Sequence, residues 1–274
     1  WRGQRTINLN KHMTEGMRFR NKLAYDLIRG IPQMVGLRTQ FVHLYVKDNT
    51  EESDGKFEDY GIYTQVEQLN KTALKSHGLD SNGQLYKINS FEFYRYEDII
   101  KKEDDAGYDK TAFEKMLEIK GDSDHTKLID MLTDLNDYSI GIEDVLKEHF
   151  DEENIVYWMA FQILMGNVDT QNRNVYLYSP LNSDIWYFIA WDNDGCLMRS
   201  EYELKNFSDQ GSWEKGISNY WGNVLFQRCL KSRSFREKLN DAILDLREYL
   251  NKDMLTSKIE SYKKLLDSKG MESS

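Results

Sequence analysis

The sequence predicts an α+β fold, with a β-rich first third and a mostly helical remainder. Two segments rich in β-branched and aromatic residues, 39–46 and 60–66, are typical of paired strands joined by the acidic connection 47–59. Towards the C-terminus, apolar residues instead recur at helical spacing over residues 235–250. Strands gathered early and helices gathered late favour the α+β class over alternating βαβ units.

The remaining elements of the first half follow from local patterns. Apolar residues over 19–28 recur at helical spacing, and Gly30-Ile31-Pro32 ends that helix. After the two strands we expect a short helix that begins near residue 70 and closes at Gly78, and then a third strand over 84–88. Another helix is indicated by the leucine and isoleucine spacing over 128–135.

A helix followed by a hairpin is predicted in the middle of the chain. Asp151 is a suitable N-cap, the following turn is acidic, and a dense apolar run leads to Gly166, a typical C-terminal stop. Residues 174–178 and 185–189 then read as two strands across a turn that contains serine, proline and asparagine. At the C-terminal end a coiled-coil partner is conceivable, but a single amphipathic segment more often packs on its own domain.

The polar residues around this hairpin predict chemistry. Asp169 and Asn174 stand five apart, as Asp and Asn do in the D-x-x-x-x-N loop of kinase-type phosphoryl-transfer enzymes, and Asp192-Asn193-Asp194 follows the second strand. Mg²⁺ prefers oxygen ligands from one or two carboxylates and an amide. A further carboxylate, off the metal, is needed to orient or deprotonate an attacking hydroxyl.

Two simpler interpretations compete with this one. Clusters of Asn and Asp often form turns, because their short side chains satisfy local backbone groups. A calcium-binding EF-hand loop would require glycine at its sixth position. Counting from Asp192, Gly195 is fourth and Cys196 falls on a ligand position, so the EF-hand interpretation fails.

Short segments across roughly residues 1–200 carry a family resemblance. They are Arg2-Gly3, Arg20-Asn21-Lys22-Leu23-Ala24, Tyr60-Gly61-Ile62-Tyr63-Thr64-Gln65-Val66-Glu67, Leu85-Tyr86-Lys87, Gly166-Asn167-Val168-Asp169 with Asn174, and Trp191-Asp192-Asn193-Asp194. On these residues the chain resembles the CotH kinase family, the spore-coat protein kinases and their relatives. The stretch between Arg2-Gly3 and the first helix is short, so a glycine-rich phosphate cover is abbreviated or lies outside the fragment.

The resemblance implies an atypical bilobal protein-kinase-like fold in a single domain, 1–274. Residues 1–92 would be the N-lobe-like part, 93–110 a charged connector and 111–274 the C-lobe-like part. It also implies ATP and Mg²⁺ as cofactors, with Mn²⁺ as a substitute, and transfer of phosphate to serine on coat, secreted or surface proteins. By position, Asp169 would be the catalytic aspartate, and Asn174 and Asp192 the metal ligands. Asp194 would serve a second metal or its water shell.

A nucleotide pocket is expected beside this site. Lys87, on the third strand, is the lysine best placed for phosphates, and Glu67 is the acid best placed to hold it. Trp186 and Tyr86 could supply flat faces for adenine, although a core position explains Trp186 nearly as well. Arg20 and Lys22 are an alternative pair for the phosphates because they flank a helix N-terminal region.

Composition limits the partners. The net charge of −10 argues against nucleic acid and is compatible with a basic, serine-rich protein substrate, though an acidic surface also aids solubility. No apolar run approaches the roughly 20 residues of a membrane span. Two cysteines and five histidines show neither a disulfide framework nor zinc spacing. Because numbering begins at Trp1, a signal peptide is not observable, and a spore-coat, secreted or surface location rests on the resemblance alone.

Two other functions stay open at this stage. One is a catalytically silent surface or coat scaffold, or an adhesin, that keeps the fold for binding. The other is a kinase of small molecules, which shares the catalytic spacing. Retention of Asp169, Asn174 and Asp192 together separates an enzyme from a pure scaffold, which has no physical need for three metal-compatible oxygens in that order.

Overall fold

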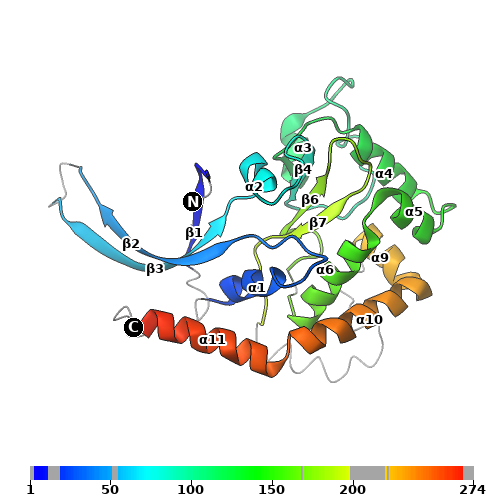
Figure 1. Cartoon of the computed structure of the whole chain (residues 1–274). Helices are drawn as coiled ribbons and strands as arrows, with labels where there is room; N and C mark the ends of the chain where they lie inside the picture. The colour runs from blue at the N-terminus through cyan, green and yellow to red at the C-terminus, as the bar shows by residue number, and fades with distance from the viewer. Residues whose placement is uncertain are drawn as a thin grey trace.

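The structure is a computed structural model, which describes residues 3–11, 19–50, 55–167, 169–197, 220 and 222–267. Of the residues that carry the family resemblance, Arg2 and Val168 lie outside these ranges. The described part contains antiparallel sheets and helices, which confirms the predicted α+β class (Figure 1).

The elements take the following bounds. The strands are β1 (Ile7–Asn10), β2 (Thr39–Lys47), β3 (Phe57–Glu67), β4 (Gln84–Ile88), β5 (Leu117–Ile119), β6 (Val175–Ser179) and β7 (Tyr187–Ala190). The helices are α1 (Arg20–Ile28), α2 (Lys71–Ser76), α3 (Lys110–Met116), α4 (Thr126–Asn136), α5 (Ile142–His149), α6 (Glu152–Leu164), α9 (Val224–Lys231), α10 (Arg233–Tyr249) and α11 (Lys252–Asp267).

The first sheet is an antiparallel ribbon of order β1-β3-β2. Strands β2 and β3 pair from Thr39 opposite Val66 out to Lys47 opposite Phe57, with an irregularity between Leu44 and Tyr45. The predicted pairing is confirmed, and both strands extend into the connection that we expected to be a loop. Figure 1 shows this hairpin projecting from the rest of the molecule.

The second sheet, of order β5-β4-β6-β7, is buried on both faces. Tyr86 and Ile88 of β4 point into the larger hydrophobic cluster, whereas Leu85 joins the smaller one with Tyr25 of α1. Because β4 pairs with β6, the expected lobe boundary near residue 92 is not a boundary between sheets.

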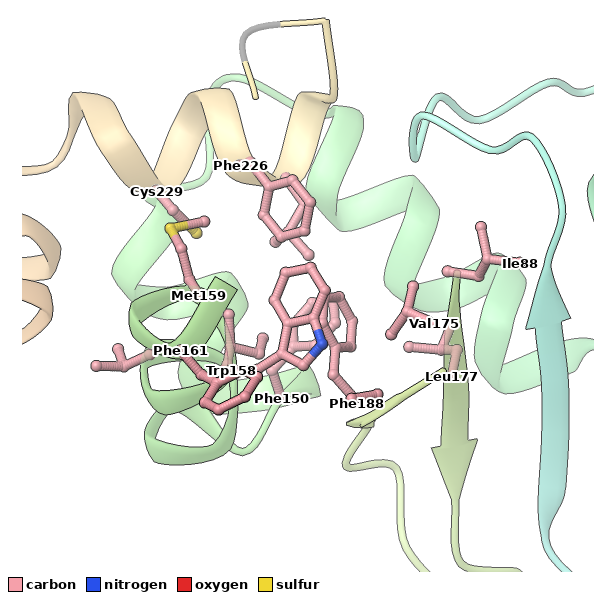
Figure 2. Close-up of a cluster of buried hydrophobic side chains, with 14 of the residues drawn as sticks. Ile88, Phe150, Trp158, Met159, Phe161, Val175, Leu177, Phe188, Phe226 and Cys229 are labelled. Carbon is pink, nitrogen blue, oxygen red and sulfur yellow. The ribbon is translucent and has the colours of Figure 1, made fainter. Parts of the chain in front are cut away.

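Aromatic packing joins this sheet to helix α6. The Trp158 ring stacks on Phe226 of α9 with centroids 5.5 Å apart and meets Phe188 of β7 edge-on at 5.1 Å (Figure 2). Asp151 caps α6 by accepting a hydrogen bond from the Asn154 N–H, as expected. Gly166, at φ +59°, ends the helix in the left-handed conformation that glycine adopts without strain.

The C-terminal helices pack on their own domain. Helix α10 lies along α6, where Tyr157 donates a hydrogen bond of 2.8 Å to Asp245 (Figure 1). Tyr249 at the end of α10 donates to the Leu27 carbonyl of α1 at 3.0 Å. The apolar residues Phe235, Leu239 and Leu246 of α10 are buried in the larger hydrophobic cluster, so the face that a coiled-coil partner would need is already covered.

Residues 89–109, which include most of the expected connector 93–110, have no helix or strand but are packed against the core. Phe91, Phe93 and Ile100 are fully or almost fully buried in the larger cluster. The charged composition of this segment therefore describes its outer side only.

Candidate functional site

The β6–β7 hairpin brings Asn174 and Asp192 to one end of the second sheet. Val175 pairs with Ala190, and the Trp191 N–H donates to the Asn174 carbonyl at 3.2 Å. The residues just outside the two strands are therefore neighbours. Asn174 has φ +57° and Asp192 φ +46°, the left-handed region that Asn and Asp tolerate better than most residues.

The loop after α6 carries Asp169 to the same place. Asn174 donates from Nδ2 to both the backbone oxygen and Oδ2 of Asp169, each at 3.0 Å. Arg173 Nε lies 3.6 Å from Asp169 Oδ1, and both side chains are about half exposed. Because the Asn174 amide nitrogen is committed to Asp169, its amide oxygen is the atom left for a cation.

A close approach between two loops fixes Asp169 from the other side. Buried Asn167 donates to Gln162 Oε1 at 2.9 Å and accepts the Asp169 N–H at 3.3 Å. A Cβ at Gly195 would lie 2.5 Å from Asn167 Oδ1. Glycine at residue 195 is therefore what lets the segment after β7 reach the segment after α6.

Helix α1 supplies two site residues that the sequence analysis did not identify. Asn21 donates to Asp192 Oδ1 at 3.3 Å and accepts the Asn193 N–H at 3.0 Å, while Tyr25 accepts the Asp192 N–H at 2.9 Å. The two lie one turn apart, and both are buried. The available signal was a polar Asn on the face of a helix that is otherwise expected to be apolar.

The electrostatics follow from burial and from the aspartates. Burial raises the pKa of Tyr25 well above its ordinary value, the hydrogen bond from the Asp192 N–H lowers it, and the charges of Asp192 and Asp194 raise it further. Tyr25 is therefore a neutral phenol at physiological pH. Asp194, half-buried, also raises the pKa of Cys196, whose burial is the larger cause.

The donor set suits a hard divalent cation bound together with phosphate. Asp192 and Asn174 offer only oxygen ligands, which Mg²⁺ and Mn²⁺ accept. Within the described residues, no three His, Cys, Asp or Glu side chains converge as a metal centre. A cation here would take its other ligands from phosphate oxygens and water, as Mg²⁺ commonly does in nucleotide sites.

The predicted pairing of Glu67 with Lys87 is wrong. Arg38 binds Glu67 Oε1 at 2.5 Å through its guanidinium and Oε2 at 3.0 Å through its backbone N–H, and His77 Nε2 lies 2.7 Å from Oε2. The reason is register: Glu67 N–H donates to the Arg38 carbonyl, so Arg38 is its neighbour. Burial raises the pKa of Glu67, but the hydrogen bonds from His77 and Arg38 outweigh it and leave the pKa below its ordinary value.

Lys87 lies on the sheet face that carries Tyr176 and Tyr25, opposite Tyr176 in β6 and Glu118 in β5. The Tyr176 ring meets the Trp191 ring edge-on, with centroids 5.4 Å apart. Trp191 directly precedes Asp192, so Tyr176 lies between Lys87 and the Asp192 segment. A role for Lys87 with phosphates stays a prediction.

The expected adenine faces are not available in this structure. Tyr86 and Trp186 are each 0% exposed, with ring centroids 6.0 Å apart inside the larger cluster. Tyr86 also shares a hydrogen bond of 2.7 Å with His125 Nδ1. The prediction that adenine stacks on either ring is therefore wrong. Trp186 is a core residue, as the alternative interpretation had it.

Of the two alternative phosphate contacts, Lys22 is engaged elsewhere. Its Nζ is buried and donates to Asp26 at 2.8 Å and to Thr39 at 3.2 Å, away from the Asp192 segment. Arg20 lies close enough to the segment after β7 for its charge to lower the pKa of Cys196.

Comparison with known proteins identifies the family of this chain. The chain is 24% identical over 240 residues to Inner spore coat protein H of Bacillus subtilis (strain 168), a match that covers 86% of this chain and 60% of that protein. This chain thus spans less than two thirds of that relative. None of the described helices has the length and apolarity needed to cross a membrane. The family model described as CotH kinase protein matches residues 1–274, and the chain therefore belongs to the CotH kinase family.

Proposed function

We propose that this protein is an ATP-dependent protein kinase that transfers the γ-phosphate of ATP to serine. The single observation that carries the proposal is the meeting of Asp169, Asn174 and Asp192 at one end of the β6–β7 hairpin. Three oxygen-bearing side chains, two of them on left-handed residues, are held there by neighbouring loops. Unusual backbone conformations of this kind concentrate at functional sites.

Each residue has a distinct role in the proposal. Asp192 and the Asn174 amide oxygen would hold Mg²⁺, which when bound would supply positive charge to the phosphates, and Asp194 would support a second cation or its water shell. Asp169, half exposed and held by Asn174, orients the attacking serine hydroxyl and accepts its proton. Lys87 binds phosphates from the sheet.

The substrate is proposed to be a basic, serine-rich protein of the spore coat or cell surface. The net charge of −10 favours encounter with a basic partner, and the curated relative is an inner spore coat protein by name. Charge alone also fits an acidic surface that promotes solubility, so acceptor specificity has to be measured.

Labelled ATP provides the test. The purified chain is incubated with γ-labelled ATP and Mg²⁺, together with a basic serine-rich protein, a serine-poor basic protein or small alcohols. The proposal expects label on serine of the first acceptor only. Label on small alcohols would instead favour a small-molecule kinase. A protein that transfers no label to any acceptor and shows no Mg²⁺-dependent ATP binding would be a scaffold.

A further inference from the structure

Helix α1 contacts the Asp192 segment through two buried polar side chains. Asn21 and Tyr25 are one turn apart on this helix and make three hydrogen bonds to Asp192 and Asn193. We propose that Asn21 and Tyr25 are positioning residues that aim the Asp192 carboxylate at the cation. This inference rests on the proposed function, because it assumes that Asp192 binds the metal of Mg²⁺-ATP.

Asn21 makes a two-point contact that only an amide can make. Its Nδ2 donates to Asp192 Oδ1 at 3.3 Å, and its Oδ1 accepts the Asn193 N–H at 3.0 Å. A carboxylate in its place would repel Asp192, and a hydroxyl is too short to reach both groups. The contact fixes the orientation of the carboxylate and the peptide that follows it.

Tyr25 fixes the backbone of the same residue. Its hydroxyl oxygen accepts the Asp192 N–H at 2.9 Å, and its ring, 1% exposed, packs in the smaller cluster with Tyr176 and Ile189. Asp192 at φ +46° occupies a sparsely populated conformation, which persists only where surrounding groups hold it. The hydroxyl of Tyr25 is one such group.

Helix α1 is itself firmly packed and can therefore hold the Asp192 segment in a fixed position. Its residues Leu23, Leu27 and Ile28 are fully buried in the larger hydrophobic cluster, and Tyr262 donates to Asp26 on its far face at 2.5 Å. Groups that hold metal ligands from behind commonly contribute 10- to 100-fold to metal affinity or activity. The same size of effect is expected from Asn21 and Tyr25.

The experiment compares Tyr25→Phe with Tyr249→Phe. Each change removes one hydroxyl that bonds a backbone group, but only Tyr25 touches Asp192. Calorimetry measures ATP binding across a Mg²⁺ titration and in excess chelator, and thermal unfolding checks that each protein is folded. For Tyr25→Phe we expect half-maximal binding to need about 10- to 100-fold more Mg²⁺, with binding in chelator unchanged. Tyr249→Phe should follow the wild type.

Three results would contradict the inference. If the Mg²⁺ concentration for half-maximal binding rises no more in Tyr25→Phe than in Tyr249→Phe, the inference is overturned while the proposed function stays in place. An equal loss of binding with and without metal would assign Tyr25 to general folding. Wild-type binding that is independent of metal would overturn the proposed function and this inference together. If Tyr25→Phe does not fold, Asn21→Ala is subjected to the same titration with the same expectation.

Discussion

At the scale of single residues, the choice of Asn and Asp at the two left-handed positions is a physical requirement. Asn174 and Asp192 have φ values of +57° and +46°, where most side chains are strained. Their short polar side chains tolerate this conformation and also carry oxygens. Substitution of Asp192 by Asn therefore alters its charge with little backbone cost, whereas Ala would change both.

Gly195 offers a direct test of the contact between the two loops. A Cβ there would lie 2.5 Å from Asn167 Oδ1, and Asn167 cannot move easily because Gln162 holds its amide at 2.9 Å. We expect Gly195→Ala to cost about 1–3 kcal/mol of unfolding free energy, as overpacking does, and to lower phosphate transfer by displacing Asp169. Gly222→Ala is the control, since no atom of the residues that the structure describes lies within 4 Å of its added Cβ. Equal activity and stability in the two variants would show that the loops do not need this approach.

Trp186 should behave as a core residue and not as a nucleotide contact. The ring is fully buried beside Tyr86, and Lys127 Nζ lies 5.8 Å from its centroid. Trp186→Ala is expected to lose about 3–5 kcal/mol of unfolding free energy, with the KM for ATP unchanged in the folded fraction. Urea unfolding and steady-state kinetics measure both quantities. A raised KM in an equally stable variant would restore the ring to the nucleotide pocket.

The residues of the site divide into those that local sequence reveals and those that it does not. Asp169, Asn174 and Asp192 were predictable as a group because one hairpin, close in sequence, brings them together. The partner of Glu67 was not, since Arg38 and Lys87 are both basic residues beside predicted strands. Only the register of β2 against β3 decides between them, and that register depends on long-range packing.

At the scale of elements, α1 has two working faces. One face holds the Asp192 segment through Asn21 and Tyr25. On the other, Lys22 and Asp26, whose side chains are 8% and 13% exposed, form an ion pair, and Asp26 meets Tyr262 of α11. Burial raises the pKa of Asp26, but hydrogen bonds from Lys22 and Tyr262 outweigh burial and hold the pKa below its ordinary value.

The C-terminal helix is therefore expected to stabilise α1 through one hydroxyl. Tyr262→Phe removes the hydrogen bond to the Asp26 carboxylate while the ring keeps its edge contacts with Phe19 and Phe41. A hydrogen bond to a charged group contributes roughly 1.5–3 kcal/mol, so a loss of that order is expected at pH 7. Tyr138→Phe, at an exposed tyrosine, should change stability by less than about 0.5 kcal/mol. Equal denaturation midpoints for the two variants would contradict a stabilising role for the Tyr262 hydroxyl.

Periodicity and turn chemistry predicted the elements that are long or well capped. Helices α1 and α6, the β2–β3 pair and the β6–β7 hairpin all appear close to their expected bounds. Strands β1 and β5 were missed because they are short and owe their conformation to the strands they pair with. The pairing of β4 with β6 spans some ninety residues of sequence, a distance over which local patterns carry no information.

At the scale of the whole molecule, buried carboxylates make stability depend on pH. Asp26 and Glu67 both have pKa values below their ordinary ones in the folded state. Their contribution is therefore fully present above the unfolded pKa values, near 4, and is lost as pH falls through the folded values. The free energy of unfolding should decline steadily below about pH 4.5.

Urea unfolding from pH 7 to pH 3 measures this decline. Glu67→Gln leaves the Arg38 guanidinium, whose side chain is only 15% exposed, without its carboxylate. The change should cost about 3–5 kcal/mol at pH 7 and make the decline in acid shallower. If the free energy of unfolding of the wild type stays constant or rises as the pH falls from 5 to 3, the lowered pKa values of Asp26 and Glu67 are contradicted.

The arrangement of the whole molecule leads to one central claim: residues from α1, the loop after α6 and the β6–β7 hairpin converge to hold Mg²⁺-ATP and a serine hydroxyl. The claim separates two carboxylates by role. In the proposed function, Asp169 acts on the hydroxyl, whereas Asp192 binds the metal.

The most direct test measures Mg²⁺-ATP affinity and serine phosphorylation on the same preparations of wild type, Asp169→Asn and Asp192→Asn. Asp169→Asn should keep most of its nucleotide affinity while transfer falls roughly 10²–10⁴-fold, because a positioned acid–base group is lost. Asp192→Asn should lose transfer and much of the affinity together, because the metal is held less tightly. Full transfer activity in Asp169→Asn, or unchanged metal-dependent affinity in Asp192→Asn, would contradict the claim.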